Sequence, residues 1–207
     1  MTLVKICGVN DPAAFDAAVT AGADFVGFNF FPPSPRYVTP TEAAALSSRH
    51  QGGPKRIGLF VAPEEPEIEA ALAALHLDAL QLYVPAERAA ALRARFNLPL
   101  WRPVGVSTFA DLPQTPAGAD ALLIEAKPPA NASRPGGNAL TFDWSLLSGW
   151  TAPCPWLLAG GLTPANVAAA IRATGAPTVD VSSGVETAPG VKDPALIRAF
   201  IAAARAA

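Results

Sequence analysis

A cysteine and a lysine lie two positions apart in the first apolar segment of the chain, Leu3–Cys7. Alternate residues of a β-strand share one face, so Lys5 and Cys7 are expected to point the same way. A thiol beside an ammonium group has a lowered pKa, which suits a residue that abstracts protons. Cys7 is therefore a candidate base; the alternative is that it is a small buried apolar residue.

Two further side chains could act on a small substrate. Glu125 ends an apolar run that starts at Ala121. A carboxyl group next to an apolar interior has a raised pKa and can donate a proton, although Glu125 could instead pair with Lys127 and merely end its strand. Arg36 follows a proline-rich loop. Its planar guanidinium suits a carboxylate ligand, but it could also be a solvated charge.

Two turns near the end of the chain combine glycine with other small residues after an apolar run. Glycine lets a ligand approach backbone N–H groups, and serine adds hydroxyl donors, so both favour an anion near a helix start. Each turn alone is usually only a turn. Together, after the last two expected strands, they predict a phosphate-binding site. The candidate residues are Gly160, Gly161, Ser182, Ser183 and Gly184.

Short β-like runs alternate with alanine-rich helical patterns along the chain. The expected strands are Leu3–Cys7, Asp24–Phe30, Arg56–Val61, Ala79–Tyr83, Leu98–Pro103, Ala121–Glu125, Trp156–Ala159 and Thr178–Ser182. The expected helices are roughly 11–21, 40–50, 64–75, 85–96, 108–112, 143–148, 163–174 and 193–206. This alternation predicts an α/β protein, a single (βα)8 TIM barrel over residues 1–207. A doubly wound sheet is the alternative, but the glycine-rich dinucleotide turn after its first strand is absent.

Four of the expected helices start with a side chain that can cap them. A capping oxygen before a proline or an acidic residue is typical of a helix start. The four starts are Asp11-Pro12, Thr41 with Glu42, Thr163-Pro164 and Asp193-Pro194.

The barrel hypothesis also sorts residues by face, because chemistry lies at the carboxyl ends of the strands. Cys7, Tyr83 and Glu125 fall at that end. The two histidines, His50 and His76, fall on the other side, so if the protein is an enzyme it is expected to work without histidine. Cys154 also lies at the opposite end, which makes a disulfide with Cys7 improbable.

Composition excludes several classes of protein. The chain has 207 residues, of which 51% are hydrophobic and 15% charged, with a net charge of -2. These values indicate an ordered globular chain with no nucleic-acid or membrane footprint. No apolar run is long enough to span a bilayer, and no signal segment precedes the first strand, so a cytoplasmic location is expected. The spacing of cysteine and histidine predicts neither a metal site nor a disulfide framework.

Several stretches, in this order, resemble the phosphoribosylanthranilate isomerase family of tryptophan biosynthesis. They run from residue 5 to residue 193 and together are specific, although no single one is. The stretches are Lys5–Gly8, Gly22–Asp24 leading to Ser34–Arg36, Gly58–Val61, Gln81–Leu82, Phe142–Trp144, Leu158–Leu162, Asp180–Glu186 and Gly190–Asp193.

The resemblance implies an Amadori rearrangement of N-(5'-phosphoribosyl)anthranilate to 1-(o-carboxyphenylamino)-1-deoxyribulose 5-phosphate. It implies that Cys7 is the base, that Glu125 stands at the position of the acid, and that Arg36 holds the anthranilate carboxylate. Asp180 would lie near the sugar hydroxyls, and the two glycine loops would bind phosphate. Lys5, Gln81 and Tyr83 are expected to complete the substrate site. No cofactor is implied, and the protein is expected to be a monomer or a homodimer.

Three positions depart from the family pattern. Glu125 replaces an aspartate, Tyr83 replaces a histidine, and Ala139 in the loop 134–139 replaces a glycine. One additional methylene moves a carboxyl group by about 1 Å, which can cost on the order of a hundredfold in rate.

These departures leave a second hypothesis open, a phosphosugar-binding paralogue with weak or altered isomerase activity. A third hypothesis is the related isomerase reaction of histidine biosynthesis. Its substrate has phosphates at both ends, whereas the segment Val61–Glu65, where a second anion would bind, is acidic.

Overall fold

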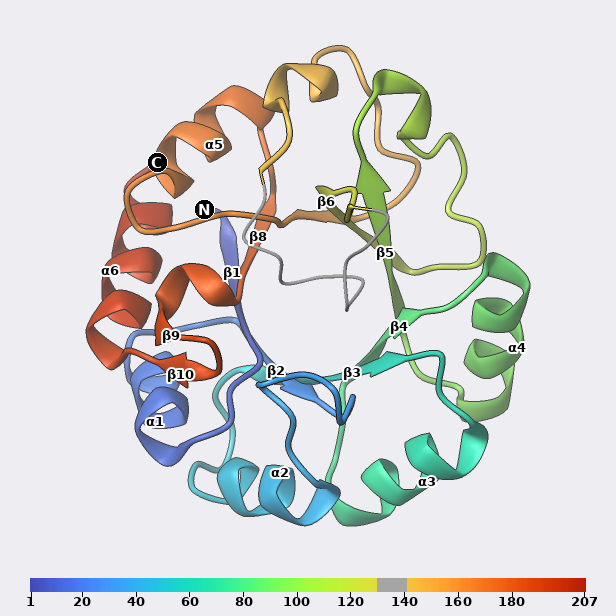
Figure 1. Ribbon diagram of the computed structural model, residues 1–207, viewed down its shortest axis with the longest axis vertical. Coiled ribbons are helices and arrows are strands. Elements are labelled where there is room, and N and C mark those ends of the chain that lie inside the picture. The colour runs from blue at the N-terminus through green and yellow to red at the C-terminus, as the bar shows by residue number, and fades with distance from the viewer. Residues whose placement is uncertain (130–140) are drawn as a thin grey trace.

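Eight parallel strands close into a barrel, and helices surround it (Figure 1). The computed structural model describes residues 1–129 and 141–207. The strands are β1 (Leu3–Cys7), β2 (Phe25–Asn29), β3 (Lys55–Val61), β4 (Ala79–Tyr83), β5 (Leu100–Val106), β6 (Ala121–Ala126), β7 (Trp156–Leu158) and β8 (Thr178–Val181). Because β1 pairs in parallel with both β2 and β8, the sheet has no free edge. The predicted (βα)8 barrel is confirmed, and the doubly wound alternative is wrong.

The helical layer is less regular than the sequence pattern predicts. The α-helices among the described residues are α1 (Pro12–Thr20), α2 (Pro40–Ser47), α3 (Glu65–Ala74), α4 (Ala86–Phe96), α5 (Val167–Thr174) and α6 (Pro194–Arg205). The helices expected at 108–112 and 143–148 are only short 3-10 turns, η1 (Phe109–Asp111) and η2 (Trp144–Leu147). Pro113 follows η1 and cannot donate a backbone hydrogen bond, and Gly149, with φ of 76°, follows η2, so neither turn extends.

Helix starts were predicted correctly where aspartate precedes proline. Asp11 caps α1 and Asp193 caps α6, each by accepting a backbone N–H of the first turn. The prediction for α2 is wrong by two residues, because Thr39 rather than Thr41 is the cap and forms a reciprocal capping box with Glu42. The start predicted at Thr163 is also wrong, since Asn166 accepts the N–H of Thr163 and α5 begins only at Val167.

Inward-facing side chains divide the barrel interior into an apolar and a polar part. The apolar part is a cluster that includes Ile57, Ala79, Trp101, Leu123 and Leu157, with Phe25 packed edge-on against Trp101. Residues two positions further along a strand share its inward face but lie closer to its carboxyl end. They include Gln81 and Glu125, so buried polar groups lie directly beyond the apolar cluster.

A small antiparallel hairpin was not predicted. Its strands are β9 (Glu186–Ala188) and β10 (Val191–Lys192), placed after the 3-10 turn η3 (Ser183–Val185). At its tip Gly190 has φ of 81°, and a Cβ there would collide with the carbonyl oxygen of Pro35. The hairpin therefore packs closely against the loop after β2, which only glycine allows at this position.

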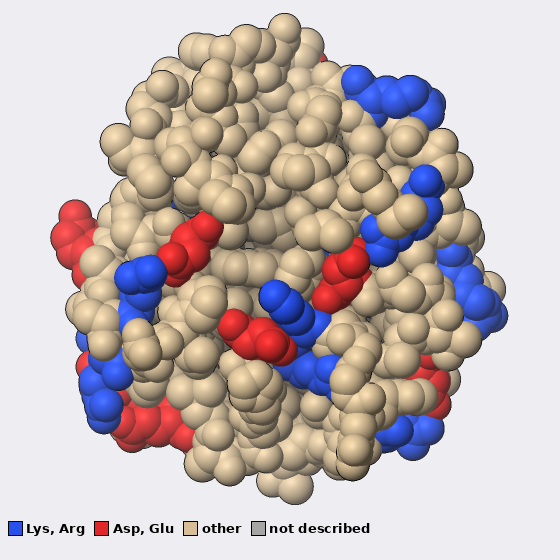
Figure 2. All heavy atoms as spheres, turned by 180° about the vertical axis from the view of Figure 1, so that it is seen from behind, with Lys and Arg blue, Asp and Glu red and all other residues tan. Residues whose placement is uncertain are grey.

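Charged side chains on the face shown in Figure 2 form small groups of mixed sign. Paired surface charges include Arg49 with Asp16 and Arg93 with Asp120. No described helix is long and apolar enough to cross a membrane. The loop 134–139, with Ala139, lies outside the described residues.

The start of α2 can be tested by stability. Replacing Thr39 with alanine removes the oxygen that accepts the N–H of Glu42, and is expected to lower the free energy of unfolding by about 1 kcal/mol. Thr41→Ala is the matched control, because Thr41 lies inside the exposed first turn and should cause no loss. Urea denaturation of both variants measures the difference. Equal losses would contradict the cap assignment.

Candidate active site

A buried ammonium group links three strands at the centre of the barrel. The side chain of Lys5 on β1 is completely buried. Its Nζ lies 2.8 Å from Asp180 Oδ1 on β8 and donates to Gln81 Oε1 on β4 at 2.9 Å. Burial lowers the pKa of Lys5, but Asp180 and Cys7 more than offset this, so the net pKa is raised and the group stays charged. The structure thus brings together three of the predicted substrate-binding residues.

Cys7 ends β1 on the same inward face and is buried. Gly27 on β2 is its register partner, and a Cβ at Gly27 would lie 3.0 Å from Cys7 Sγ. The predicted direction of the thiol pKa is wrong. Burial raises the pKa of Cys7; Lys5 lowers it and Asp180 raises it, and the balance lies above the ordinary value. Lys5 does lower the pKa of Cys7, but burial and Asp180 together outweigh it.

Glu125 is the last but one residue of β6 and is buried, and Tyr83 ends β4. The Tyr83 hydroxyl donates to Glu125 Oε1 at 3.0 Å. Burial raises the pKa of Glu125 to about 8, even though the Tyr83 hydrogen bond lowers it; Asp180 raises it and Lys5 lowers it. Burial also raises the pKa of Tyr83 well above its usual value. Both groups therefore carry their protons at neutral pH.

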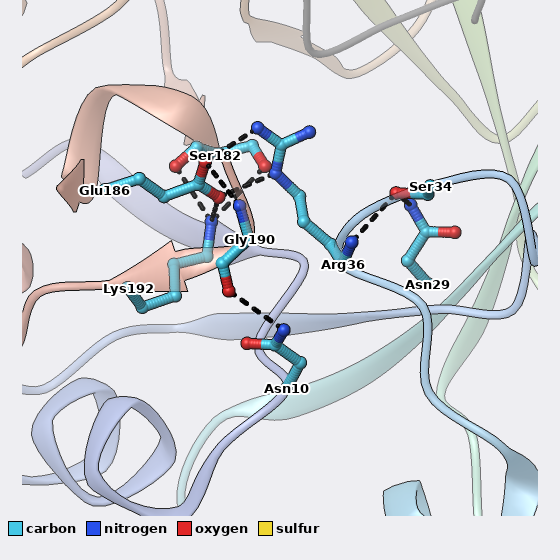
Figure 3. A network of polar contacts seen from close by, with 8 residues as sticks. All are labelled: Asn10, Asn29, Ser34, Arg36, Ser182, Glu186, Gly190 and Lys192. Carbon is cyan, nitrogen blue, oxygen red and sulfur yellow. Dashed lines mark hydrogen bonds and ion pairs between the residues drawn. The ribbon is translucent and has the colours of Figure 1, made fainter. Parts of the chain in front are cut away.

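Arg36 lies in an ion network that also includes the hairpin (Figure 3). Its Nε and Nη2 donate to the two carboxylate oxygens of Glu186 at 2.6 and 2.8 Å. Lys192 Nζ lies 2.8 Å from Glu186 Oε1 and also donates to the carbonyl oxygen of Ser182 at 2.8 Å. Burial alone would raise the pKa of Glu186, but Arg36 and Lys192 hold it below its usual range. Arg36 thus forms a bidentate contact with a carboxylate of the chain itself, and the expected contact with a ligand carboxylate stays a prediction.

The loop that carries Arg36 is held in place by hydrogen bonds of Ser34 and by close packing against Gly8. Ser34 Oγ accepts from Asn29 Nδ2 and from the backbone N–H of Arg36. A Cβ at Gly8, where φ is 70°, would lie 2.7 Å from Arg36 Cδ. Asn10 Nδ2 donates to the carbonyl of Gly190 at the hairpin tip (Figure 3). Arg36 Nη1 has no hydrogen-bond partner among the described residues, which leaves one edge of the guanidinium available.

The two glycine loops lie against each other, as predicted. A Cβ at Gly184 would overlap the carbonyl oxygen of Leu162, which follows Gly161. Gly160 and Gly161 have φ of 86° and 62°. Within the described parts of the chain, no acceptor binds the N–H groups of Gly161, Ser183 or Gly184. Ser182 is less free, because Lys192 lies 3.3 Å from its Oγ.

Sequence reasoning assigned no role to Glu186, Lys192 or Gly27. The first two belong to the stretches that resemble the family, but a hairpin of five strand residues shows no periodicity that would place them beside Arg36. Gly27 lies within an apolar run that was predicted as a strand. A glycine inside a strand can indicate that another group packs closely against the backbone, which is the signal that could have identified it. Across residues 1–129 and 141–207, no three His, Cys, Asp or Glu side chains are grouped to hold a metal ion.

A closed parallel barrel with buried polar side chains at the carboxyl ends of β1, β4, β6 and β8 is a (βα)8 barrel of the enzyme type. The sequence model of the N-(5'phosphoribosyl)anthranilate (PRA) isomerase family matches residues 4–203. The chain belongs to this family.

Individual relatives agree over the full length. The N-(5'-phosphoribosyl)anthranilate isomerase of Acidiphilium cryptum is 56% identical over 207 residues, 100% of each chain. A structure of monomers of the dimeric phosphoribosylanthranilate isomerase from Thermotoga maritima is 34% identical, with a TM-score of 0.83 and 100% of each chain covered. A phosphoribosyl anthranilate isomerase in complex with reduced 1-(o-carboxyphenylamino)-1-deoxyribulose 5-phosphate is 33% identical, with a TM-score of 0.84 and 100% of each chain covered.

The buried ion network predicts a large stability loss on neutralising its acid. Glu186→Gln leaves Arg36 and Lys192 as two uncompensated buried cations, so the free energy of unfolding should fall by about 3 kcal/mol. Denaturant unfolding measures this change. Asp16→Asn is the control, because it breaks the exposed Arg49 pair and should change stability little. Similar effects of the two substitutions would contradict the described network.

The raised pKa of Glu125 predicts how stability depends on pH. The folded protein keeps this proton up to pH of about 8, whereas the unfolded chain loses it near 4.5. Between these values the group makes the folded state less stable as pH rises, by up to about 1.4 kcal/mol per pH unit. Glu125→Gln lacks this dependence, so its stability relative to wild type should increase from pH 5 to pH 8. The exposed substitution Glu87→Gln should parallel wild type; a Glu125→Gln curve that also does so would contradict the assignment.

Proposed function

We propose that this chain catalyses the Amadori rearrangement of N-(5'-phosphoribosyl)anthranilate to 1-(o-carboxyphenylamino)-1-deoxyribulose 5-phosphate. The observation that carries the proposal is a buried carboxyl group with a pKa of about 8, in the same barrel mouth as a buried thiol and two facing glycine loops. Family membership supplies the substrate, because the names of the relatives state this activity.

In the first step Glu125 acts as the general acid. Its neutral carboxyl group protonates the furanose ring oxygen, and the C1'–O bond breaks. The lone pair of the anthranilate nitrogen forms a C1'=N double bond, so the product of ring opening is a protonated Schiff base. A carboxyl group that is still protonated at neutral pH supports this role, since the acid needs its proton before the reaction.

In the second step the Cys7 thiolate removes the proton from C2'. The C–H electrons form a C1'=C2' double bond and the C=N electrons return to nitrogen, which gives an enolamine that tautomerises to the ketone. Burial raises the pKa of Cys7, so the thiolate is a minor form in the ligand-free protein. The cationic Schiff base beside it lowers that pKa, so the base forms at the step that uses it.

The remaining polar groups bind the two ends of the substrate. We assign the 5'-phosphate to Gly160, Gly161, Ser182, Ser183 and Gly184, because backbone N–H groups and serine hydroxyls in such loops suit an anion. Arg36 takes the anthranilate carboxylate with its free Nη1 edge, while Glu186 holds the other two nitrogens. Lys5, Gln81 and Asp180 surround the sugar.

The proposal includes the wider properties of the protein. Every step uses side chains of this chain, so the reaction needs no cofactor or metal. The protein works as one domain over residues 1–207, in the cytoplasm, as a monomer or a homodimer; a dimeric relative supports the latter state.

Removing the base tests the mechanism. Cys7→Ala should lower kcat by at least about a hundredfold, because proton abstraction at C2' loses its only base. The assay is fluorescence loss on freshly generated phosphoribosylanthranilate. Cys154→Ala is the matched control, since this cysteine lies at the other end of the barrel, and should retain wild-type activity. Near-wild-type turnover by Cys7→Ala would remove the mechanism.

Binding separates the enzyme from a phosphosugar-binding paralogue. The reduced product should bind Cys7→Ala with nearly wild-type affinity in calorimetry, because the thiol holds no charge on the ligand. Tight binding by the wild-type protein without any conversion of substrate would favour the paralogue.

A further inference from the structure

Tyr83 and Glu125 reach each other across one strand. Tyr83 is the last residue of β4 and Glu125 the last but one of β6, and β5 lies between these strands in the barrel. The phenol hydroxyl donates to Glu125 Oε1 at 3.0 Å, with both side chains on the inward face. Strand pairing brings together residues of neighbouring strands only. Because β5 separates β4 from β6, this contact depends on the lengths of the Tyr83 and Glu125 side chains.

The two oxygens of Glu125 are not equivalent. Oε1 accepts a hydrogen bond from the Tyr83 hydroxyl, so we do not place the proton of the carboxyl group on this oxygen. Oε2 has no hydrogen-bond partner among the described residues, and it is not one of the fully enclosed unpaired atoms, which are Asn10 Oδ1, Arg102 Nε and Trp144 Nε1. A proton carried by this carboxyl group is therefore assigned to Oε2, the oxygen that the phenol does not contact.

We propose that Tyr83 is a positioning residue for the acid, which fixes the Glu125 carboxyl group so that its proton stays on Oε2, the atom that meets the substrate. Glutamate has one more rotatable bond than aspartate, and the phenol contact removes that freedom. The inference rests on the proposed function of Glu125. It differs from the direct role in sugar binding expected for Tyr83, because Tyr83 here acts through Glu125.

Charged neighbours set the direction of the expected titration. Glu125 faces Tyr83 on β4, Asp180 on β8 and Lys5 on β1. The Tyr83 hydrogen bond favours the carboxylate, so its loss raises the pKa of Glu125 further, while Asp180 and Lys5 act as before. A phenylalanine at position 83 keeps the ring and removes only the donor.

The first test measures Glu125 directly in the ligand-free protein. Carbon-13 NMR of labelled glutamate follows the Glu125 carboxyl group against pH, with Glu125→Gln to assign its signal. In Tyr83→Phe the titration should move to higher pH, whereas Tyr37→Phe, the other tyrosine of the chain, should leave it unchanged. An unmoved titration in Tyr83→Phe overturns the inference, whether or not the chain is an isomerase.

The second test is kinetic and uses kcat, KM and the pH profile of kcat/KM. Tyr83→Phe should lower kcat about tenfold to a hundredfold with little change in KM, and should move the limb near pH 8 upward. A raised KM with an unmoved limb would show that Tyr83 binds substrate instead, and would overturn the inference. Inactivity of the wild-type protein would overturn the proposed function. The NMR titration would then still test whether Tyr83 controls the Glu125 carboxyl group.

A double-mutant cycle tests whether the two residues act as a unit. Glu125→Asp shortens the acid beyond reach of the phenol, so adding Tyr83→Phe to it should change kcat less than about threefold. If the loss of kcat in the double variant equals the product of the losses in the two single variants, the residues act independently and the inference is overturned.

Discussion

The rest of the barrel interior depends on one buried ammonium group. Lys5 has no access to water, and an unpaired charge there would cost several kcal/mol. Asp180 and Gln81 supply its partners from β8 and β4, so three strands must hold their register for the charge to be tolerated. The apolar cluster closes the barrel on one side of this contact, and Cys7, Tyr83 and Glu125 lie on the other. The ion pair thus lies between the apolar core of the barrel and the proposed catalytic residues.

Burial, more than any neighbouring charge, sets the protonation states of Cys7 and Glu125 at the barrel mouth. It raises the pKa of both Cys7 and Glu125, because each group is charged only after it loses its proton. A neutral acid is the useful form of Glu125 at the start of the reaction, whereas a neutral thiol is not the useful form of Cys7. The same dry environment therefore prepares the acid in advance and leaves the base to be formed by the cationic intermediate.

The sequence could predict what is local or periodic. Strand positions and the aspartate caps of α1 and α6 follow from short patterns, and the end of the barrel that carries Cys7 and Glu125 follows from the fold. The segments of η1 and η2 were predicted to be helices but form only short 3-10 turns, because a helix-favouring composition does not show where a first turn fails to extend. The pKa of Cys7 was predicted in the wrong direction, because local sequence shows neither its burial, which is the main cause of the rise, nor Asp180, which lies 175 residues from Lys5. The ion partners of Arg36 were missed for the same reason, as Glu186 is 150 residues distant.

The hairpin β9–β10 joins the two ends of the proposed substrate site. Glu186 holds Arg36, which we assign to the carboxylate, and Lys192 holds the carbonyl of Ser182 in the loop that we assign to phosphate. Glu186 and Lys192 also pair with each other, so neither loop can shift without exposing a buried charge. The distance between the two anion-binding ends is therefore set by this network. A substrate with a carboxylate and a phosphate at a fixed separation needs such a constraint, because the reacting carbons lie between them.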